Sequence, residues 1–276
     1  MAKCLIVNAD DYNTDPERNR GIIEAARRGI VTTTTVIANT PWQDASTAGL
    51  KSAFGDSIGV HLNLTKGAPI VKGLSTLVDD EGRFFDKGAV WRKALLGLFD
   101  LKEMQTEFAA QITLLRERGI VPDHLDGNNH VHVFPGVAGV AAGLARDFGI
   151  PCARLPHERF ARPGEYVRRG AAKKTLIGRL SQYARRVFET HGIIFPERFA
   201  GIQFPEIVRV DELCAFVASL PHGATELMCH PGYRSPSDNP FSSPAREEEL
   251  ASLTHPSVKD ALRRAGVTLI SFQELV

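Results

Sequence analysis

Three of the nine histidines in this 276-residue chain lie between residues 124 and 132, in the stretch HLDGNNHVHV. Alternate residues of this stretch are polar and suited to binding a metal ion or a proton: His124, Asp126, Asn128, His130 and His132. Successive side chains of a β-strand point to opposite faces, so a strand here would place all of them on one face. The spacing therefore predicts a polar strand face, and its imidazoles indicate a possible metal site.

Two adjacent acids, Asp10 and Asp11, follow the apolar run at residues 4–9. Neighbouring carboxylates in a buried setting raise one another's pKa unless a cation separates their roles. One acid can then ligate a metal ion while the other takes a proton from the water that the ion activates. The same pair also suits a turn or a helix cap before residues 13–19, because Asp and Asn favour both.

Two further histidines lie in or directly after apolar runs. His61 lies within GVHLNLT, and His230 follows ELMC. A strand would hold the His61 imidazole rigidly enough to ligate a metal, although a hydrogen-bonded core histidine is the simpler alternative. His230 could protonate a leaving amine because imidazole titrates near neutral pH, or it could be an exposed loop residue.

Short apolar, β-prone runs alternate with helical patterns along the chain, which implies a mostly parallel sheet. The predicted strands are residues 4–9, 31–38, 57–64, 124–132, 151–155, 224–229 and 267–272. The predicted helices are residues 17–29, 42–53, 103–118, 137–148, 165–190, 211–219 and 257–265. Residues 66–90 and 156–205 are predicted excursions from this repeating core.

The position of the polar residues favours a barrel over an open sheet. Groups able to bind metals or protons end or follow separate predicted strands, at Asp10 and Asp11, His61, residues 126–132, Arg154 and His230. In barrels, chemistry collects at the carboxyl ends of several strands. We therefore predict an α/β protein whose residues 1–276 form a single-domain, distorted (β/α) TIM-like barrel with mostly parallel strands.

Composition excludes several classes of protein. Lys and Arg number 33 against 32 Asp and Glu, a balance that argues against nucleic acid as the main partner. No apolar run approaches the roughly 18 residues of a membrane span, so no stable membrane insertion is expected. The four cysteines are scattered and include no CxxC pair, as is typical of a reducing compartment. We expect a soluble, cytoplasmic protein, with a homodimer among the oligomeric states left open.

The motifs IVNADD, GVHLNLT, HLDGNNHVHVFP and ELMCHPGY together resemble those of the YdjC-like carbohydrate deacetylases, which include chitooligosaccharide and hopanoid-biosynthesis deacetylases. The resemblance extends from Leu5 to about Glu274. It implies a hydrolase that removes an acetyl group from an N-acetylated sugar, with one divalent ion, Mg²⁺ or Zn²⁺, as cofactor.

Position by position, the resemblance assigns roles to the residues at the ends of the predicted strands. It implies that Asp11 and His61 are metal ligands and that Asp10 is the base that activates water. It implies that His230 is the acid that protonates the sugar nitrogen. The residues predicted on the substrate side of the site are Arg154, Asp126, His130 and His132, with Asp126 as a hydrogen-bonding support for a neighbouring group.

The sequence departs from the family at Asn128, where relatives usually carry a histidine that is the third ligand. The amide oxygen of Asn128 could bind a hard cation such as Mg²⁺, although it suits zinc poorly. His130 could replace it, but two residues along a strand displace it by roughly 6.6 Å. Alternatively the metal is held weakly, and the protein is a slow enzyme or a sugar-binding relative. A phosphoester hydrolase is disfavoured because the sequence has no Gly-rich phosphate loop.

Overall fold

The computed structural model describes residues 2–42, 46–158, 166–202, 209–235 and 243–276. Its centre is one parallel sheet with the strand order β5-β4-β3-β2-β1-β7-β6, and β8 pairs with the first residues of β1. The strands are β1 (Lys3–Tyr12), β2 (Thr33–Val36), β3 (Ile58–Leu62), β4 (His124–Gly127), β5 (Cys152–Ala153), β6 (Arg198–Ala200), β7 (Gly223–Cys229) and β8 (Val267–Leu269). Every pairing between these strands is parallel.

The sheet curls so that its two edges approach each other. The backbone N–H of Ala153 at the β5 edge donates to the carbonyl of Ile194 at 2.9 Å. A second parallel bridge joins Glu158 to Phe199 of β6. These isolated bridges connect the edges in place of a continuous ladder. The predicted distorted (β/α) barrel with parallel strands is therefore confirmed.

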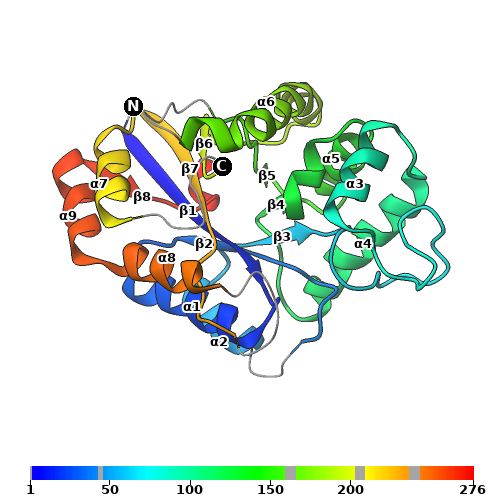
Figure 1. Cartoon of the computed structure of the whole chain (residues 1–276), viewed down its shortest axis with the longest axis horizontal. Helices are drawn as coiled ribbons and strands as arrows, with labels where there is room; N and C mark the ends of the chain where they lie inside the picture. The colour runs from blue at the N-terminus through cyan, green and yellow to red at the C-terminus, as the bar shows by residue number, and fades with distance from the viewer. Residues whose placement is uncertain (1, 43–45, 159–165, 203–208, 236–242) are drawn as a thin grey trace.

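Helices cover the outside of the curled sheet (Figure 1). Helices α3, α4 and α5 lie at one end of the molecule, α7 and α9 lie at the other, and α6 lies along one side (Figure 1). The helices are α1 (Pro16–Arg28), α2 (Ser46–Phe54), α3 (Lys87–Leu95), α4 (Leu101–Glu117), α5 (Val137–Asp147), α6 (Tyr166–Thr190), α7 (Val210–Ala218), α8 (Pro244–Thr254) and α9 (Pro256–Ala265). None of the helices in the described residues is long and apolar enough to cross a membrane.

Local sequence explains why α1 and α4 form where the sequence predicts helices. The carboxylate of Asp15 caps α1 by accepting from the backbone N–H of Arg18 at 2.9 Å, and Pro16 occupies the first turn, where no N–H is needed. In α4 the apolar side chains recur at helical spacing, and Phe108 and Ile112 are fully buried against the sheet.

The prediction of one strand through residues 124–132 is wrong. Strand β4 ends at Gly127, and the chain turns into a 3₁₀ helix, Asn128–Val133. Asn129 and His130 have φ angles of 55° and 61°, in the left-handed region that Asn tolerates better than most residues. A Cβ at Gly127 would lie 2.9 Å from Nδ1 of His132, so the chain can fold back here only over a glycine. The five polar residues of this stretch therefore do not share a strand face.

Gly21 offers a test of how tightly α1 packs on the loop that follows β7. A Cβ at Gly21 would lie 2.5 Å from Cα of Gly232, two residues after His230. Ala in a helix interior is normally better than Gly by roughly 1 kcal/mol, but crowding here should outweigh that gain. We expect Gly21→Ala to lower the free energy of unfolding by about 1–3 kcal/mol, measured by urea denaturation.

The matched control is Gly143→Ala in α5, where the new Cβ would meet nothing within 4 Å apart from the adjacent backbone of its own helix. This variant should raise the free energy of unfolding by up to about 1 kcal/mol. If both variants changed the free energy of unfolding in the same direction, the close packing of α1 on Gly232 would be contradicted.

Candidate active site

The end of β1 brings two adjacent carboxylates to one cavity. In a regular strand the side chains of Asp10 and Asp11 would point to opposite faces. The register of β1 against β2 shifts between Ala9 and Tyr12, and Asp11 has a φ of 71°. The carbonyl of Asp11 accepts from Oγ1 of Thr14 at 2.7 Å, which secures the turn. Because of this irregularity both acids line the same cavity.

The cavity has a volume of about 330 Å³, within the range of small-molecule sites. Most of the predicted site residues line it, namely Asp10, Asp11, His61, Asn128, His130 and His230. They come from β1, β3, the 3₁₀ helix and the residue after β7, so the strand-end convergence expected from the sequence is present. Asp126, His132 and Arg154 are fully buried, and they are not among the lining residues.

The guanidinium of Arg154, directly after β5, binds three buried carboxylates, one of which, Asp10, lines the cavity. Its two terminal nitrogens donate to the two oxygens of Asp10 at 2.6 Å each. Nη1 also lies 2.8 Å from Oδ2 of Asp126, and Nε donates to Glu226 at 2.7 Å. Burial raises the pKa of Asp10 although the guanidinium opposes that rise, and burial raises the pKa of Glu226 to about 7. Arg154 thus fixes the carboxylate plane of Asp10.

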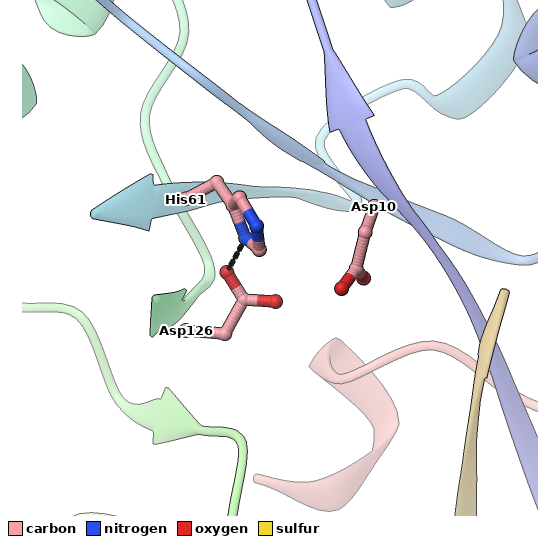
Figure 2. Close-up of side chains that lie close together, drawn as sticks. All are labelled: Asp10, His61 and Asp126. Atoms are coloured by element: carbon pink, nitrogen blue, oxygen red, sulfur yellow. Dashed lines mark hydrogen bonds and ion pairs between the residues drawn. The ribbon is translucent and has the colours of Figure 1, made fainter. Parts of the chain in front are cut away.

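His61 is held on one side so that its other nitrogen faces Asp11. Figure 2 shows Asp126 bonded to the His61 ring, with Asp10 pointing toward the same space from β1. Nδ1 of His61 bonds Oδ1 of Asp126, while Nε2 lies 3.5 Å from Oδ1 of Asp11. Burial alone would lower the pKa of His61, but the carboxylates of Asp126, Asp10 and Asp11 raise it to about 9. The imidazole is therefore protonated near pH 7 when no ion is bound, and a metal at Nε2 would displace that proton while Asp126 still orients the ring from Nδ1.

Two sets of atoms could hold a metal ion. Asp10, His61 and Asp126 are buried and offer ligand atoms within 4.8 Å of one another. However, Arg154 already binds both of these carboxylates, so an ion among them would face a guanidinium. Oδ1 of Asp11 and Nε2 of His61 face each other at 3.5 Å, less than twice a metal–ligand bond of about 2.0–2.2 Å. One ion can therefore contact both atoms. Nη1 of Arg18 lies 3.7 Å from the other oxygen of Asp11, Oδ2, which is farther than Arg154 lies from Asp10 and Asp126, so the pair of Asp11 and His61 fits a metal better.

Asn128 lies at the same cavity within a network of amides. Its Nδ2 donates to Oδ1 of Asn63 at 3.2 Å, and its Oδ1 accepts from Nδ2 of Asn129 at 3.1 Å. The backbone of Asn63 is held in turn by the Gln111 amide of α4, through bonds of 2.9 and 2.8 Å. An amide oxygen has two lone pairs, so Asn128 can keep its bond to Asn129 and still offer one pair to an ion.

The two histidines after Asn128 differ in their surroundings. Nε2 of His132 donates to the carbonyl of Arg154 at 3.1 Å, and His132 supports the arginine from behind. The His130 ring lines the cavity edge-on to Phe199, with ring centroids 6.1 Å apart. Burial lowers the pKa of both rings, that of His132 to about 4. Both are therefore neutral near pH 7, and only His130 lies where a substrate could touch it.

His230 faces Asp10 from the end of β7. Its Nε2 lies 3.8 Å from Oδ2 of Asp10, and its backbone N–H donates to Glu249 at 3.1 Å. Glu249 also accepts from Nη1 of Arg246 at 3.0 Å. Burial, with a further contribution from Arg246, lowers the pKa of His230 well below its usual value. The imidazole is therefore neutral near pH 7.

Several residues of the site were not anticipated from the sequence: Arg18, Lys87, Lys173, Glu226, Arg246 and Glu249. Glu226 had a readable signal, because it is an acid inside the otherwise apolar stretch ATELMC. Arg246 and Glu249 lie three residues apart on α8, a spacing that also occurs on ordinary solvated helices, so nothing in the sequence marked them.

The fold and the site define an α/β barrel protein whose acids and histidines gather at the ends of parallel strands, where barrel enzymes carry their active sites. The family model described as YdjC-like protein matches residues 4–264, and the chain belongs to this family. The carbohydrate deacetylase of Homo sapiens is 32% identical over 98% of this chain and 90% of its own length. The chitooligosaccharide deacetylase of Serratia marcescens is 32% identical over the whole of both chains. A crystal structure of an Enterococcus faecalis V583 protein matches all of both chains with a TM-score of 0.80 and 25% identity.

Arg154→Met tests the buried charge cluster. Removing the guanidinium leaves Asp10, Asp126 and Glu226 buried without their cation, and breaking such a group typically costs about 3–5 kcal/mol. We expect a loss of that size in the free energy of unfolding, measured by urea denaturation at pH 7. The control is Arg146→Met, which breaks the exposed pair with Asp147 and should change the value by less than about 0.5 kcal/mol. Equal losses in the two variants would refute the role given to Arg154.

Proposed function

We propose that this protein is a metal-dependent hydrolase that removes the acetyl group from an N-acetylated sugar. Relatives over nearly the full chain are named carbohydrate deacetylase or chitooligosaccharide deacetylase. The observation that carries the proposal is the pairing at one cavity of a metal-suited pair, Asp11 and His61, with a separately anchored carboxylate, Asp10. Deacetylation of an amide needs both a polarised carbonyl and a base for water.

Asp11 and His61 would hold the metal ion, with Asn128 as a third, weaker ligand. An ion bound there would polarise the acetyl carbonyl and make a nearby water more acidic. Asp126 keeps the His61 ring oriented by bonding Nδ1, which leaves Nε2 toward Asp11. The fully buried Asp126 therefore acts through His61 rather than on the sugar itself.

Asp10 would be the general base. Arg154 holds both of its oxygens, so the carboxylate is presented to the cavity in one orientation. Burial raises the pKa of Asp10 from its ordinary value, and this increases its affinity for a proton. The predicted contact of Arg154 with substrate is replaced here by a positioning role, because its side chain is fully buried.

His230 would return the proton to the sugar nitrogen. Its Nε2 is 3.8 Å from Asp10, close enough to exchange a proton through a small shift or a single water. Because burial lowers its pKa, protonated His230 gives up its proton readily to the departing amine. His130, neutral and at the cavity wall, would hydrogen-bond the sugar.

Acetate release from short chitooligosaccharides tests the proposal, with metal-stripped protein compared before and after addition of Zn²⁺ or Mg²⁺. We expect release only with added metal. Asp10→Asn should keep the metal affinity but lower turnover by about 10² to 10⁴-fold, because the amide preserves shape and removes the base. Calorimetric titration of the metal checks the first part. An Asp10→Asn protein of full activity would refute the assignment.

Asn128→His tests the third ligand position. Imidazole outcompetes an amide oxygen for borderline ions, so zinc should bind more tightly to the variant than to the parent. The increase in affinity for magnesium should be smaller, since Mg²⁺ prefers oxygen ligands. Titration of both proteins with both ions by calorimetry gives the result.

Unchanged affinities for both ions in Asn128→His would place residue 128 outside the ligand set. Acetate release gained only in the variant would favour the alternative function, a sugar-binding relative that has lost a ligand. Activity need not rise with affinity, because the ring is larger than the amide it replaces.

A further inference from the structure

The residues that follow β7, 230–234, are bonded to helix α8 through their backbone. The N–H of His230 donates to Oε1 of Glu249 at 3.1 Å, and the N–H of Gly232 donates to the carbonyl of Arg246 at 3.3 Å. Alternate N–H groups of this segment therefore point to α8, as they would to a partner in a sheet. Helix α8 thus takes the place of a neighbouring strand where His230 reaches the cavity.

The two residues that end this segment are bonded as well. The N–H of Tyr233 donates to the carbonyl of Glu17 in α1 at 3.2 Å, and the N–H of Arg234 donates to Oε1 of Glu247 in α8 at 2.8 Å. Glu247 is exposed, whereas Glu249 is only 3% exposed. Of these two α8 carboxylates, the one that holds His230 is therefore the one withdrawn from water.

The carboxylate of Glu249 is itself held in one orientation. Oε2 accepts from Nη1 of Arg246 at 3.0 Å, while Oε1 accepts from the backbone of His230. Arg246 and Glu249 lie three residues apart on α8, and both side chains are buried. A buried ion pair adds little net stability, because the loss of hydration offsets most of the attraction. The pair therefore contributes mainly to the geometry of the chain at His230.

The position of the His230 ring depends on this geometry. Nε2 lies 3.8 Å from Oδ2 of Asp10, within reach of the atoms that react in the proposed deacetylation. A shift of the backbone at His230 would move the ring with it. A misplacement of about 1 Å in an active site can cost about 10²-fold in rate.

We propose that Glu249 is a positioning residue for His230: its carboxylate, clamped by Arg246, fixes the proton donor against the departing amine. The inference rests on the proposed role of His230 as the acid, and it adds a residue that acts through that acid. As the C–N bond breaks, its electron pair moves to the nitrogen, which takes the proton from Nε2 of His230. The sugar then leaves as the free amine, and the imidazole becomes neutral.

Two acetyl donors separate this proton transfer from the rest of the reaction. Short chitooligosaccharides release an amine that needs a proton, whereas 4-nitrophenyl acetate releases 4-nitrophenolate, which leaves without one. The metal-loaded protein is assayed with both donors, and the rate of the metal-stripped protein is subtracted.

In Glu249→Gln one of the two carboxylate oxygens becomes an NH₂ group, which cannot accept from Arg246 or from the backbone of His230. The ratio of kcat for the amide to kcat for the ester should fall by about tenfold, part of the roughly 10² to 10⁴-fold that a general acid contributes. The KM for the amide should stay unchanged.

Glu247→Gln is the matched control, because it makes the same substitution on the same helix and its amide oxygen can still accept from the N–H of Arg234. It should leave the ratio unchanged. Equal losses for the amide and the ester in Glu249→Gln would indicate a general disturbance of the site, and a raised KM alone would make Glu249 a sugar contact. Either result, or an unchanged ratio, would overturn the proposal.

The ring resonances of His230 in NMR spectra, assigned by their loss in His230→Gln, give a second readout that needs no turnover. They should shift in Glu249→Gln and stay in place in Glu247→Gln. Shifted resonances in a protein that releases no acetate from chitooligosaccharides would support the positioning of His230 and defeat the deacetylase function. Acetate release with resonances that Glu249→Gln leaves in place would keep the function and defeat the positioning role.

Discussion

The guanidinium of Arg154 is the group on which the rest of the site depends. It is fully buried, and taking a charge out of water costs several kcal/mol unless partners satisfy it. Asp10 from β1, Asp126 from β4 and Glu226 from β7 supply those partners at 2.6–2.8 Å. Since these strands are far apart in the sequence, the cluster forms only when the sheet has closed around it. The same contacts that stabilise the arginine therefore define the position of the proposed base.

Asp126 connects the proposed base to the proposed metal ligands. One of its oxygens lies 2.8 Å from Nη1 of Arg154, and the other bonds Nδ1 of His61. Thr35 on β2 donates to the same carboxylate at 3.2 Å. A displacement of Asp126 would thus move His61 and loosen Arg154 together. Preorganisation of this kind keeps reacting groups in place without a conformational step, which is where much of the advantage of an enzyme site arises.

The sequence predicts the strand ends well and the connections between them poorly. Residues 4–9, 57–64 and 224–229 are apolar runs with polar ends, and parallel strands bring such ends to the same side of a sheet. Strand β6 has only three residues, and α3 buries only Val90 and Ala94, so neither has an apolar pattern strong enough to recognise. The partners of Arg154 could not be read from the sequence, because an ion pair between β1 and the residue after β5 depends on the curl of the sheet.

Residues 128–133 show why polar residues at every second position do not by themselves establish a β-strand. Alternation predicts a strand only if the backbone stays extended, and the pair Asn128-Asn129 after Gly127 is also typical of a tight left-handed turn. The turn brings Nδ2 of Asn129 to the amide of Asn128 and its carbonyl to the Trp91 indole N–H, which donates to it at 3.1 Å.

Asn128 is consequently held from both sides by neighbours suited to an amide. Asn63 accepts from its nitrogen and Asn129 donates to its oxygen, so the orientation of the side chain is fixed before any ion arrives. A neutral imidazole at this position could donate one N–H to Asn63, but its single acceptor nitrogen could not bind an ion and also accept from Asn129. The amide that stands where the resemblance to the family implies a histidine is therefore matched by its surroundings. With Asn128 as the proposed third ligand, the site would favour an oxygen-preferring ion over zinc, because residue 128 offers a hard amide oxygen.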